Sequence, residues 1–298
     1  MTDRVLVPFD FSPPARRALA LAMQGFPFGR EVSIELLHVI DEGLYENVLA
    51  RRHIPSDDAI VGYLQAELDR IRAELMVSTG GKIDLLMPEP MVVRGRPYAI
   101  IDARMHEPEI TGVLIGGQGH GGATERLLGR TAQRVIRHAE VPVLVVKQPD
   151  ALALPTRLLT AVDWSESAGR ALQFAARLRA QIDGLLSIVH VIDSPFVPYV
   201  QAFASEHDAD EALDQVHADQ RDHLGKFVHT TIGAIDKSIS ELVVFGEPGR
   251  AIAEQAARSA SELVVVGMYG SANLSRFLLG STAEKLIAAA DCDVLVVP

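Results

Sequence analysis

The 298-residue chain contains a single cysteine, a single tryptophan and no long apolar run. Cys292 cannot form a disulfide within the chain, and its place beside an apolar segment is typical of a small buried thiol. The longest apolar runs have the length of strands and stay well below the roughly 18 residues that a membrane-spanning helix needs. The chain does not start with a basic segment followed by an apolar one, so we expect no secretory signal and a cytoplasmic location.

Basic residues are also scarce, with 28 Lys and Arg against 39 Asp and Glu, which gives a formal net charge of -11. A chain of this sign repels phosphate backbones and anionic lipid surfaces, so neither nucleic acid nor a membrane is an expected partner. A small anionic ligand is not excluded, because a helix N-terminus and a few backbone N–H groups can hold phosphate locally. The length and the ordinary apolar content, 48% of residues, favour two globular domains.

The two expected domains are copies of each other. Four segments recur at offsets of 151 to 153 residues: 5–12 and 158–165, 36–41 and 188–193, 92–97 and 243–248, and 141–146 and 292–297. Small loop deletions explain the drift in the offset. The repeat predicts domains at residues 1–148 and 156–298, separated by a segment that contains Pro149 and Pro155.

Within each copy, short apolar runs alternate with longer stretches of 3.6-residue periodicity. This alternation predicts an α/β fold, with two repeated doubly wound domains that each hold a parallel five-stranded sheet and four helices. In the first copy we expect strands near 4–9, 33–40, 90–94, 112–116 and 142–146. Ser12 and Ser165 are the expected N-caps of the first helices, and the second helices are expected near 57–78 and 205–230. If the strand order is 3-2-1-4-5, strands 1 and 4 meet at the point where open α/β sheets bind ligands.

A glycine pattern follows the fourth strand of each copy. It reads Gly116-x2-Gly119-x9-Gly129-Arg130 in the first copy and Gly267-x2-Gly270-x9-Gly280-Ser281-Thr282 in the second. Glycines let backbone N–H groups approach a ligand closely, and the last glycine opens a helix whose first N–H groups and positive dipole end face outward. The pattern therefore predicts an anion site suited to phosphates.

The placement of these glycines excludes two familiar phosphate loops. No glycine-rich loop ends in Gly-Lys-Ser/Thr, and a dinucleotide fold would place its glycines after the first strand, where this chain has Asp-Phe-Ser and Asp-Trp-Ser. A structural explanation also remains for one residue. Ser281 and Glu284 fit a capping box, in which Ser281 would only cap its helix.

Both copies resemble universal stress protein domains of the class that carries the ATP-binding pattern Gly-x2-Gly-x9-Gly-(Ser/Thr), over nearly all of both halves. The resemblance implies an adenine nucleotide α-hydrolase-like fold and a nucleotide-binding regulator of the stress response. The implied ligand is ATP, with AMP or ADP as alternatives, with or without Mg²⁺. It also implies association through the fifth strand, which can pair the two halves of one chain or join two chains as a homodimer.

The resemblance further implies a role for each site residue. Asp10 and Val39 in the first copy, and Asp163 and Val191 in the second, would lie at the adenine and ribose end of the ligand. The phosphates would be held by Gly116, Gly119, Gly129, Arg130 and Thr131, and by Gly267, Gly270, Gly280, Ser281 and Thr282. Arg130 departs from the family pattern, because it replaces a hydroxyl with a fixed positive charge.

Catalytic and metal-binding roles have less support in the sequence. There is no His-Glu-x-x-His or Cys/His cluster, and His38 and His190 are expected to be packed strand residues. Asp10 and Asp163 lack an identifiable partner acid, histidine or lysine nearby, so catalysis is expected to be slow or absent. Two alternatives stay open: a slow ATP-hydrolysing or phosphoryl-transfer protein, and a nucleotide-free scaffold.

The remaining expectations concern aromatic and histidine side chains near the second site. Trp164 directly follows Asp163 at the predicted carboxyl end of the second copy's first strand, where successive residues point to opposite sides. If Asp163 faces the ligand crevice, we expect the Trp164 ring to lie beside the crevice and not in it. The histidines of the charged second helices, His217 and His223 among them, are expected to be solvated.

Overall fold

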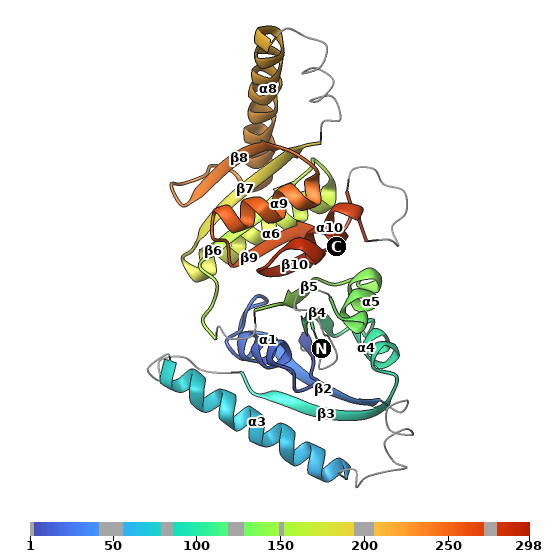
Figure 1. Ribbon diagram of the computed structural model, residues 1–298. Coiled ribbons are helices and arrows are strands. Elements are labelled where there is room, and N and C mark those ends of the chain that lie inside the picture. The colour runs from blue at the N-terminus through green and yellow to red at the C-terminus, as the bar shows by residue number, and fades with distance from the viewer. Residues whose placement is uncertain are drawn as a thin grey trace. The chain divides into compact units, whose positions relative to one another are not determined.

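The computed structural model describes residues 3–41, 56–78, 86–118, 128–148, 152–193, 206–270 and 279–298. The chain divides into two compact units, Met1–Leu154 and Pro155–Pro298. Figure 1 draws the first unit in blue to green and the second in yellow to red. Each unit is a parallel sheet with helices on both faces, so the α/β class and the repeated doubly wound sheet are confirmed.

In the first unit the strand order is β3-β2-β1-β4-β5, and all neighbouring strands are parallel. The described elements are β1 (Arg4–Pro8), α1 (Pro13–Met23), β2 (Ser33–Asp41), α3 (Asp57–Ser78), β3 (Pro88–Gly95), α4 (Pro97–Met105), β4 (Ile110–Gly116), α5 (Arg130–His138) and β5 (Val143–Val146). Strands 1 and 4 are therefore neighbours, and the chain reverses its direction of winding between them.

The second unit repeats this arrangement as β8-β7-β6-β9-β10, again with parallel neighbours. Its described elements are β6 (Arg157–Val162), α6 (Glu166–Ile182), β7 (Leu185–Ile192), α8 (Glu206–Ile232), β8 (Ile239–Phe245), α9 (Pro248–Arg258), β9 (Leu263–Gly267), α10 (Ser281–Ala289) and β10 (Asp293–Val297). The strand order expected from the sequence is thus confirmed in both units.

The first helix of each unit begins at the expected serine. Ser12 Oγ accepts a hydrogen bond from Ala15 N at 3.3 Å, and Ser165 Oγ accepts one from Ala168 N at 3.1 Å. These caps satisfy backbone donors that a helix start leaves open. Helix α1 is buried on nearly all sides, whereas the long α3 buries only one stripe, made by Leu64, Leu68, Ile71 and Leu75. Helix α1 therefore lies in the core of the first unit, whereas α3 covers it from outside with one apolar side.

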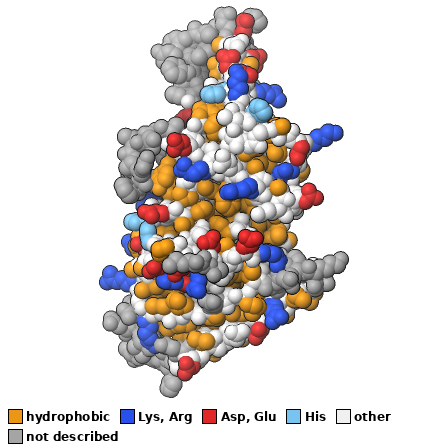
Figure 2. Space-filling view, turned by 180° about the vertical axis from the view of Figure 1, so that it is seen from behind, with side chains coloured by type: hydrophobic (Ala, Val, Ile, Leu, Met, Phe, Trp, Pro, Cys, Tyr) orange, Lys and Arg blue, Asp and Glu red, His pale blue; other side chains and the backbone are white. Residues whose placement is uncertain are grey.

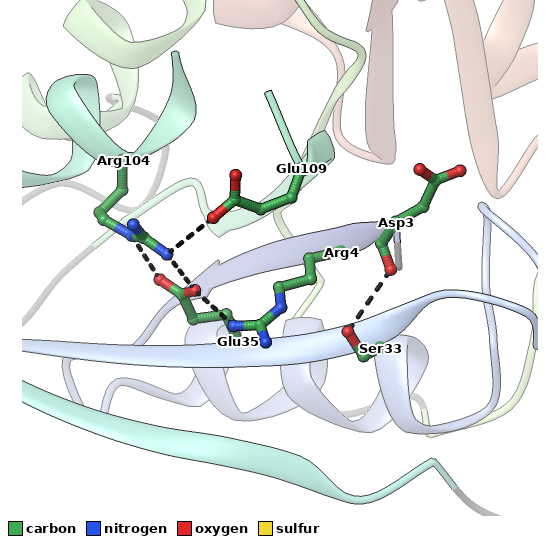
Figure 3. A network of polar contacts seen from close by, with 6 residues as sticks. All are labelled: Asp3, Arg4, Ser33, Glu35, Arg104 and Glu109. Atoms are coloured by element: carbon green, nitrogen blue, oxygen red, sulfur yellow. Dashed lines mark hydrogen bonds and ion pairs between the residues drawn. The ribbon is translucent and has the colours of Figure 1, made fainter. Parts of the chain in front are cut away.

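A buried ion-pair network ties β2 to α4 in the first unit only (Figure 3). The Glu35 side chain is 1% exposed and accepts a hydrogen bond from Arg104 Nε at 2.8 Å, with Arg4 Nη1 3.4 Å away. This hydrogen bond raises the pKa of Arg104, which stays charged. The register-equivalent residue in the second unit is Ser187, because Glu35 lies opposite Leu6 and Ser187 lies opposite Leu159.

Figure 2 shows one face of the molecule, on which Lys and Arg side chains are scattered singly among apolar and acidic ones. Within the described residues no helix is both long and apolar enough to span a membrane.

Candidate functional site

Asp10 and Asp163 lie just beyond the carboxyl ends of β1 and β6, at the start of the turn into the next helix. Asp163 Oδ1 accepts hydrogen bonds from the backbone N of Ser165 at 3.2 Å and from its Oγ at 2.5 Å. Asp10 Oδ1 likewise accepts from Ser12 N at 3.0 Å. One carboxylate oxygen of each aspartate is thus fixed by its own turn. The two copies place the same acid in the same way.

The residue after each aspartate adopts a left-handed backbone conformation. Phe11 has φ 63° and Trp164 has φ 67°, a region that costs energy for residues other than glycine. Such outliers persist where the surrounding structure holds them, and here the aspartate–serine hydrogen bonds hold both ends of the turn. The chain changes direction at this left-handed residue, between the end of the strand and the start of the helix.

The first glycine of each motif permits close packing between a strand end and a helix start. A Cβ at Gly267 would lie 2.7 Å from Ser167 Oγ and 2.9 Å from Ala168 N. A Cβ at Gly116 would lie 2.9 Å from Ala15 N. These approaches are closer than real Cβ contacts allow, so any larger residue would push the first helix away from the sheet. Packing alone explains these two glycines.

The second glycine brings the loop over the aspartate. A Cβ at Gly270 would lie 3.1 Å from Asp163 Oδ2, the carboxylate oxygen that does not bind the serine. The loop after the fourth strand and the acid after the first strand therefore lie together in the second unit. The counterpart in the first unit, Gly119, lies outside the described residues.

The third glycine is the N-cap of the following helix in both units. Gly280 precedes α10 and its N–H donates to Met268 O at 2.9 Å, while Gly129 precedes α5 and its N–H donates to Gly117 O at 2.7 Å. Ser281 is the first helical residue and not the N-cap, so the capping-box explanation of Ser281 is wrong. Glycine has no side chain with which to cap the helix. The first N–H groups of α10 and α5 therefore receive no acceptor from their N-cap residue.

The helix residues after these caps lie at the surface. Ser281 and Arg130 are exposed at equivalent first positions, and Thr282 and Thr131 are half-buried at the second. The hydroxyls of the second copy and the guanidinium of the first thus stand beside the open end of a helix, where negative charge is favoured.

Val39 and Val191 are half-buried near the carboxyl ends of β2 and β7, each next to a histidine. His38 Nδ1 lies 2.7 Å from Phe9 O, and His190 Nδ1 lies 2.8 Å from Val162 O. A carbonyl oxygen only accepts, so Nδ1 of each ring carries the proton. Burial lowers the pKa of His190, which favours its neutral form. These contacts agree with the expectation that both histidines are packed strand residues.

Trp164 does not continue β6, which ends at Val162, so strand alternation does not set the direction of its ring. The ring packs between two histidines, with centroid distances of 4.2 Å to His190 and 4.3 Å to His223. His223 is exposed, as the sequence suggested, but it also stacks on Trp164. His217 is half-buried, and its Nε2 contacts the backbone oxygen of Val243 at 3.1 Å, so the expectation that it is solvated is wrong. Sequence reasoning missed this stack because His223, in α8, is 59 residues away along the chain from Trp164.

The assembled group is an anion-accepting edge with a fixed carboxylate. Asp163, the backbone of Gly270 and the open start of α10 come together at the carboxyl ends of β6 and β9. Among the described residues, no group of three or more His, Cys, Asp or Glu side chains is arranged to hold a metal ion.

The universal stress protein family profile matches the chain twice, over residues 1–147 and 155–298. The chain therefore belongs to the universal stress protein family, and it carries two copies of that family's domain.

The chain is similar to universal stress proteins of different lengths. The chain is 28% identical over 147 residues to universal stress protein YxiE of Bacillus subtilis, a match that covers 47% of this chain and 97% of that protein. It is 26% identical over 200 residues to universal stress protein Rv2005c of Mycobacterium tuberculosis, covering 62% of this chain and 60% of that protein. A universal stress protein structure from Archaeoglobus fulgidus matches 100% of this chain and 98% of its own, with a TM-score of 0.61 and 21% identity, and shows the same fold.

Proposed function

We propose that this chain binds an adenine nucleotide at the carboxyl edge of each unit and acts as a nucleotide-responsive regulator in the stress response. ATP is the proposed ligand, with AMP and ADP as alternatives, and the cytosol is the proposed compartment. The observation that carries the proposal is the meeting of the Asp163 carboxylate, the Gly270 backbone and the uncapped start of α10 in one place.

Each part of this group suits one part of a nucleotide. A fixed carboxylate such as that of Asp163 accepts hydrogen bonds from ribose hydroxyls or from an amino group, and Asp10 would do the same in the first unit. The backbone near Val191 and Val39 would meet the base. Glycine N–H groups and an open helix end attract phosphate oxygens.

The phosphate end of each site is assigned by position in the motif. In the second unit it comprises Gly267, Gly270, Gly280, Ser281 and Thr282, and in the first Gly116, Gly119, Gly129, Arg130 and Thr131. Gly267 and Gly116 contribute indirectly, because their missing side chains let the loop start close to the first helix. Hydroxyl groups in one site and a guanidinium in the other predict unequal affinities.

Isothermal titration calorimetry with ATP tests the proposal. The wild-type chain is expected to bind two nucleotides, and Asp163→Ala is expected to lose the second site through the loss of a hydrogen-bonded contact worth about 1 to 3 kcal/mol. Glu166→Ala is the matched control, because the Glu166 side chain is 98% exposed and lies three residues further along the same turn. Absence of ATP, ADP and AMP binding in the wild-type chain would refute the proposal.

The two units are proposed to associate through β5 and β10. Each is the last strand of its own parallel sheet and is rich in valine and leucine. An apolar edge strand invites pairing with another strand. Hydrogen exchange of the β5 and β10 amides that face away from β4 and β9 should be slow, and sedimentation at low concentration would separate pairing within the chain from a homodimer. Exchange as fast as at an open edge would refute the pairing.

A further inference from the structure

The two units differ sharply in charge at the end of β3, at the start of α4 and along the exposed side of α5, which contacts α4 through Arg134 and Tyr98. Five exposed arginines occupy these elements, and we call this set the arginine face: Arg94, Arg96, Arg130, Arg134 and Arg137. The equivalent positions of the second unit hold Phe245, Glu247, Ser281, Lys285 and Ala288. The first unit thus carries five positive charges where the second carries a net charge of zero.

The arginine face accounts for the whole charge difference between the units. The first unit has 17 basic and 20 acidic residues, a net charge of -3, and the second has 11 and 19, a net charge of -8. Without the five arginines the first unit would also have a net charge of -8. The excess of positive charge in the first unit over the second therefore equals the charge of these five arginines.

In the second unit two of these positions neutralise each other. Lys285 Nζ lies 2.9 Å from Glu247 Oε1, which joins α10 to the start of α9. Arginines replace both partners in the first unit, as Arg96 and Arg134. The Arg134 guanidinium lies over the Tyr98 ring, 5.3 Å from its centroid, so α5 holds this charge against α4. Among the described residues no carboxylate forms an ion pair with Arg96, Arg130 or Arg134.

The placement of Arg130 and Arg134 does not favour helix stability. Arg130 is the first residue of α5, where the helix dipole disfavours positive charge, and no acidic residue stands in the first turn. Arg130 and Arg134 are four residues apart on the same side of the helix, a spacing at which like charges repel. Each of these costs is removed when an anion binds between the side chains.

We propose that the arginine face binds a chain of two or more phosphate groups. Arg130 and Arg137 are seven residues apart, about 10 Å along the helix, which exceeds the reach of a single phosphate group. Guanidinium groups match phosphate oxygens in a two-point geometry, so a row of them suits a linear polyphosphate. Free polyphosphate and the phosphate tail of a nucleotide share this chemistry.

If the ligand is the phosphate tail of a nucleotide, the inference rests on the proposed function, because Arg130 directly follows Gly129 at the first site's open helix end. In that case, the first unit prefers a nucleoside triphosphate over a monophosphate, and the second unit shows a weaker preference. If the ligand is free polyphosphate, the inference is independent of any adenine contact.

Calorimetry with inorganic tripolyphosphate on the full chain tests the site without a nucleoside. The wild type is expected to bind it with an affinity that falls as salt is added. Arg96→Glu with Arg134→Lys recreates the ion pair seen between Glu247 and Lys285, so this double variant should fold, and it should bind at least about tenfold more weakly. Arg137→Ala, which introduces the alanine found in the second unit, should also weaken binding.

Arg177→Glu in α6 is the matched control, since Arg177 is exposed and lies over the Phe174 ring in the second unit. It should leave tripolyphosphate binding unchanged. A loss of ATP-over-AMP preference in the double variant would identify a nucleotide tail as the ligand, and an unchanged preference with lost tripolyphosphate binding would identify free polyphosphate. No tripolyphosphate binding by the wild type, or an equal loss in Arg177→Glu, would overturn the inference even if ATP binds.

Discussion

Replacing Arg104 by glutamine tests how strongly the buried carboxylate of Glu35 depends on its partner. Glutamine is the residue at the equivalent position of the second unit, Gln255, so the change is compatible with the helix. Glu35 would remain buried at 1% exposure with only Arg4, 3.4 Å away, to offset its charge. We expect the free energy of unfolding of the first unit to fall by about 3 kcal/mol. This is the lower end of the loss that follows when one partner of a buried ion pair is removed, because Arg4 stays in place.

The double variant Glu35→Ser with Arg104→Gln should recover most of this loss. It removes both charges at once and reproduces the pair of residues that the second unit places there, Ser187 and Gln255. Its stability should lie within about 1 kcal/mol of the wild type, so the two changes should show a coupling of about 2 kcal/mol or more.

Urea unfolding followed by two signals measures these effects in the whole chain. Trp164 is the only tryptophan, so its fluorescence follows the second unit, whereas far-UV circular dichroism follows both. Arg104→Gln should shift the dichroism transition of the first unit, and hydrogen exchange in β2 should locate the change. A double variant as unstable as Arg104→Gln, or a single variant that loses less than about 1 kcal/mol, would show that the ion pair is not the cause.

Three further predictions follow from the site. The lowered pKa of His190 means that the unfolded chain binds a proton more readily below about pH 6.5, so the second unit should lose stability as the pH falls, by at most about 1.4 kcal/mol per pH unit. His190→Asn, which keeps a donor for the carbonyl, should flatten this slope in urea titrations, and the exposed His229→Asn should not. Gly280→Val should lower ATP affinity in calorimetry more than Gly129→Val, and equal losses would make the arginine site as competent as the hydroxyl site. Trp164 fluorescence should respond to a nucleotide in the second site, because Trp164 directly follows Asp163. If the second site binds ATP without a fluorescence response, the nucleotide does not lie beside Asp163.

Much of the fold could be predicted because a parallel sheet with crossover helices gives a regular alternation of short apolar runs and amphipathic helices in the sequence. Strand, helix and strand alternate in both copies, and the repeat lets one copy check the other. The same regularity placed Asp163 and the motif glycines at one edge, since carboxyl ends of parallel strands lie together. The topology predicts this shared edge, whereas the close approach of Gly270 to Asp163 Oδ2 depends on the loop conformation and on the side chain of Asp163.

The predictions for Ser281 and Trp164 were wrong because the local sequence pattern is compatible with two positions for the end of a helix or strand. Ser281 and Glu284 fit a capping box with Ser281 as the N-cap, but the helix begins one residue earlier, at Ser281, because Gly280 pairs with Met268 and takes the extended cap conformation itself. Trp164 looked like a strand residue, but the hydrogen bonds from Ser165 to Asp163 end the strand earlier. In both cases a hydrogen bond outside the periodic pattern set the boundary.

The aromatic residue in each strained turn packs against the neighbouring strand, while the aspartate before it belongs to the candidate site. Glycine would relieve the left-handed conformation at positions 11 and 164, yet both copies use a large ring there. Phe11 packs edge-on to His38 at 5.1 Å, and Trp164 packs on His190 at 4.2 Å. Each ring thereby covers a histidine that binds a carbonyl oxygen at the end of the unit's first strand, and in the second unit the preceding aspartate faces Gly270. The strain of the turn is thus offset by ring packing on one side and directs the carboxylate to the other.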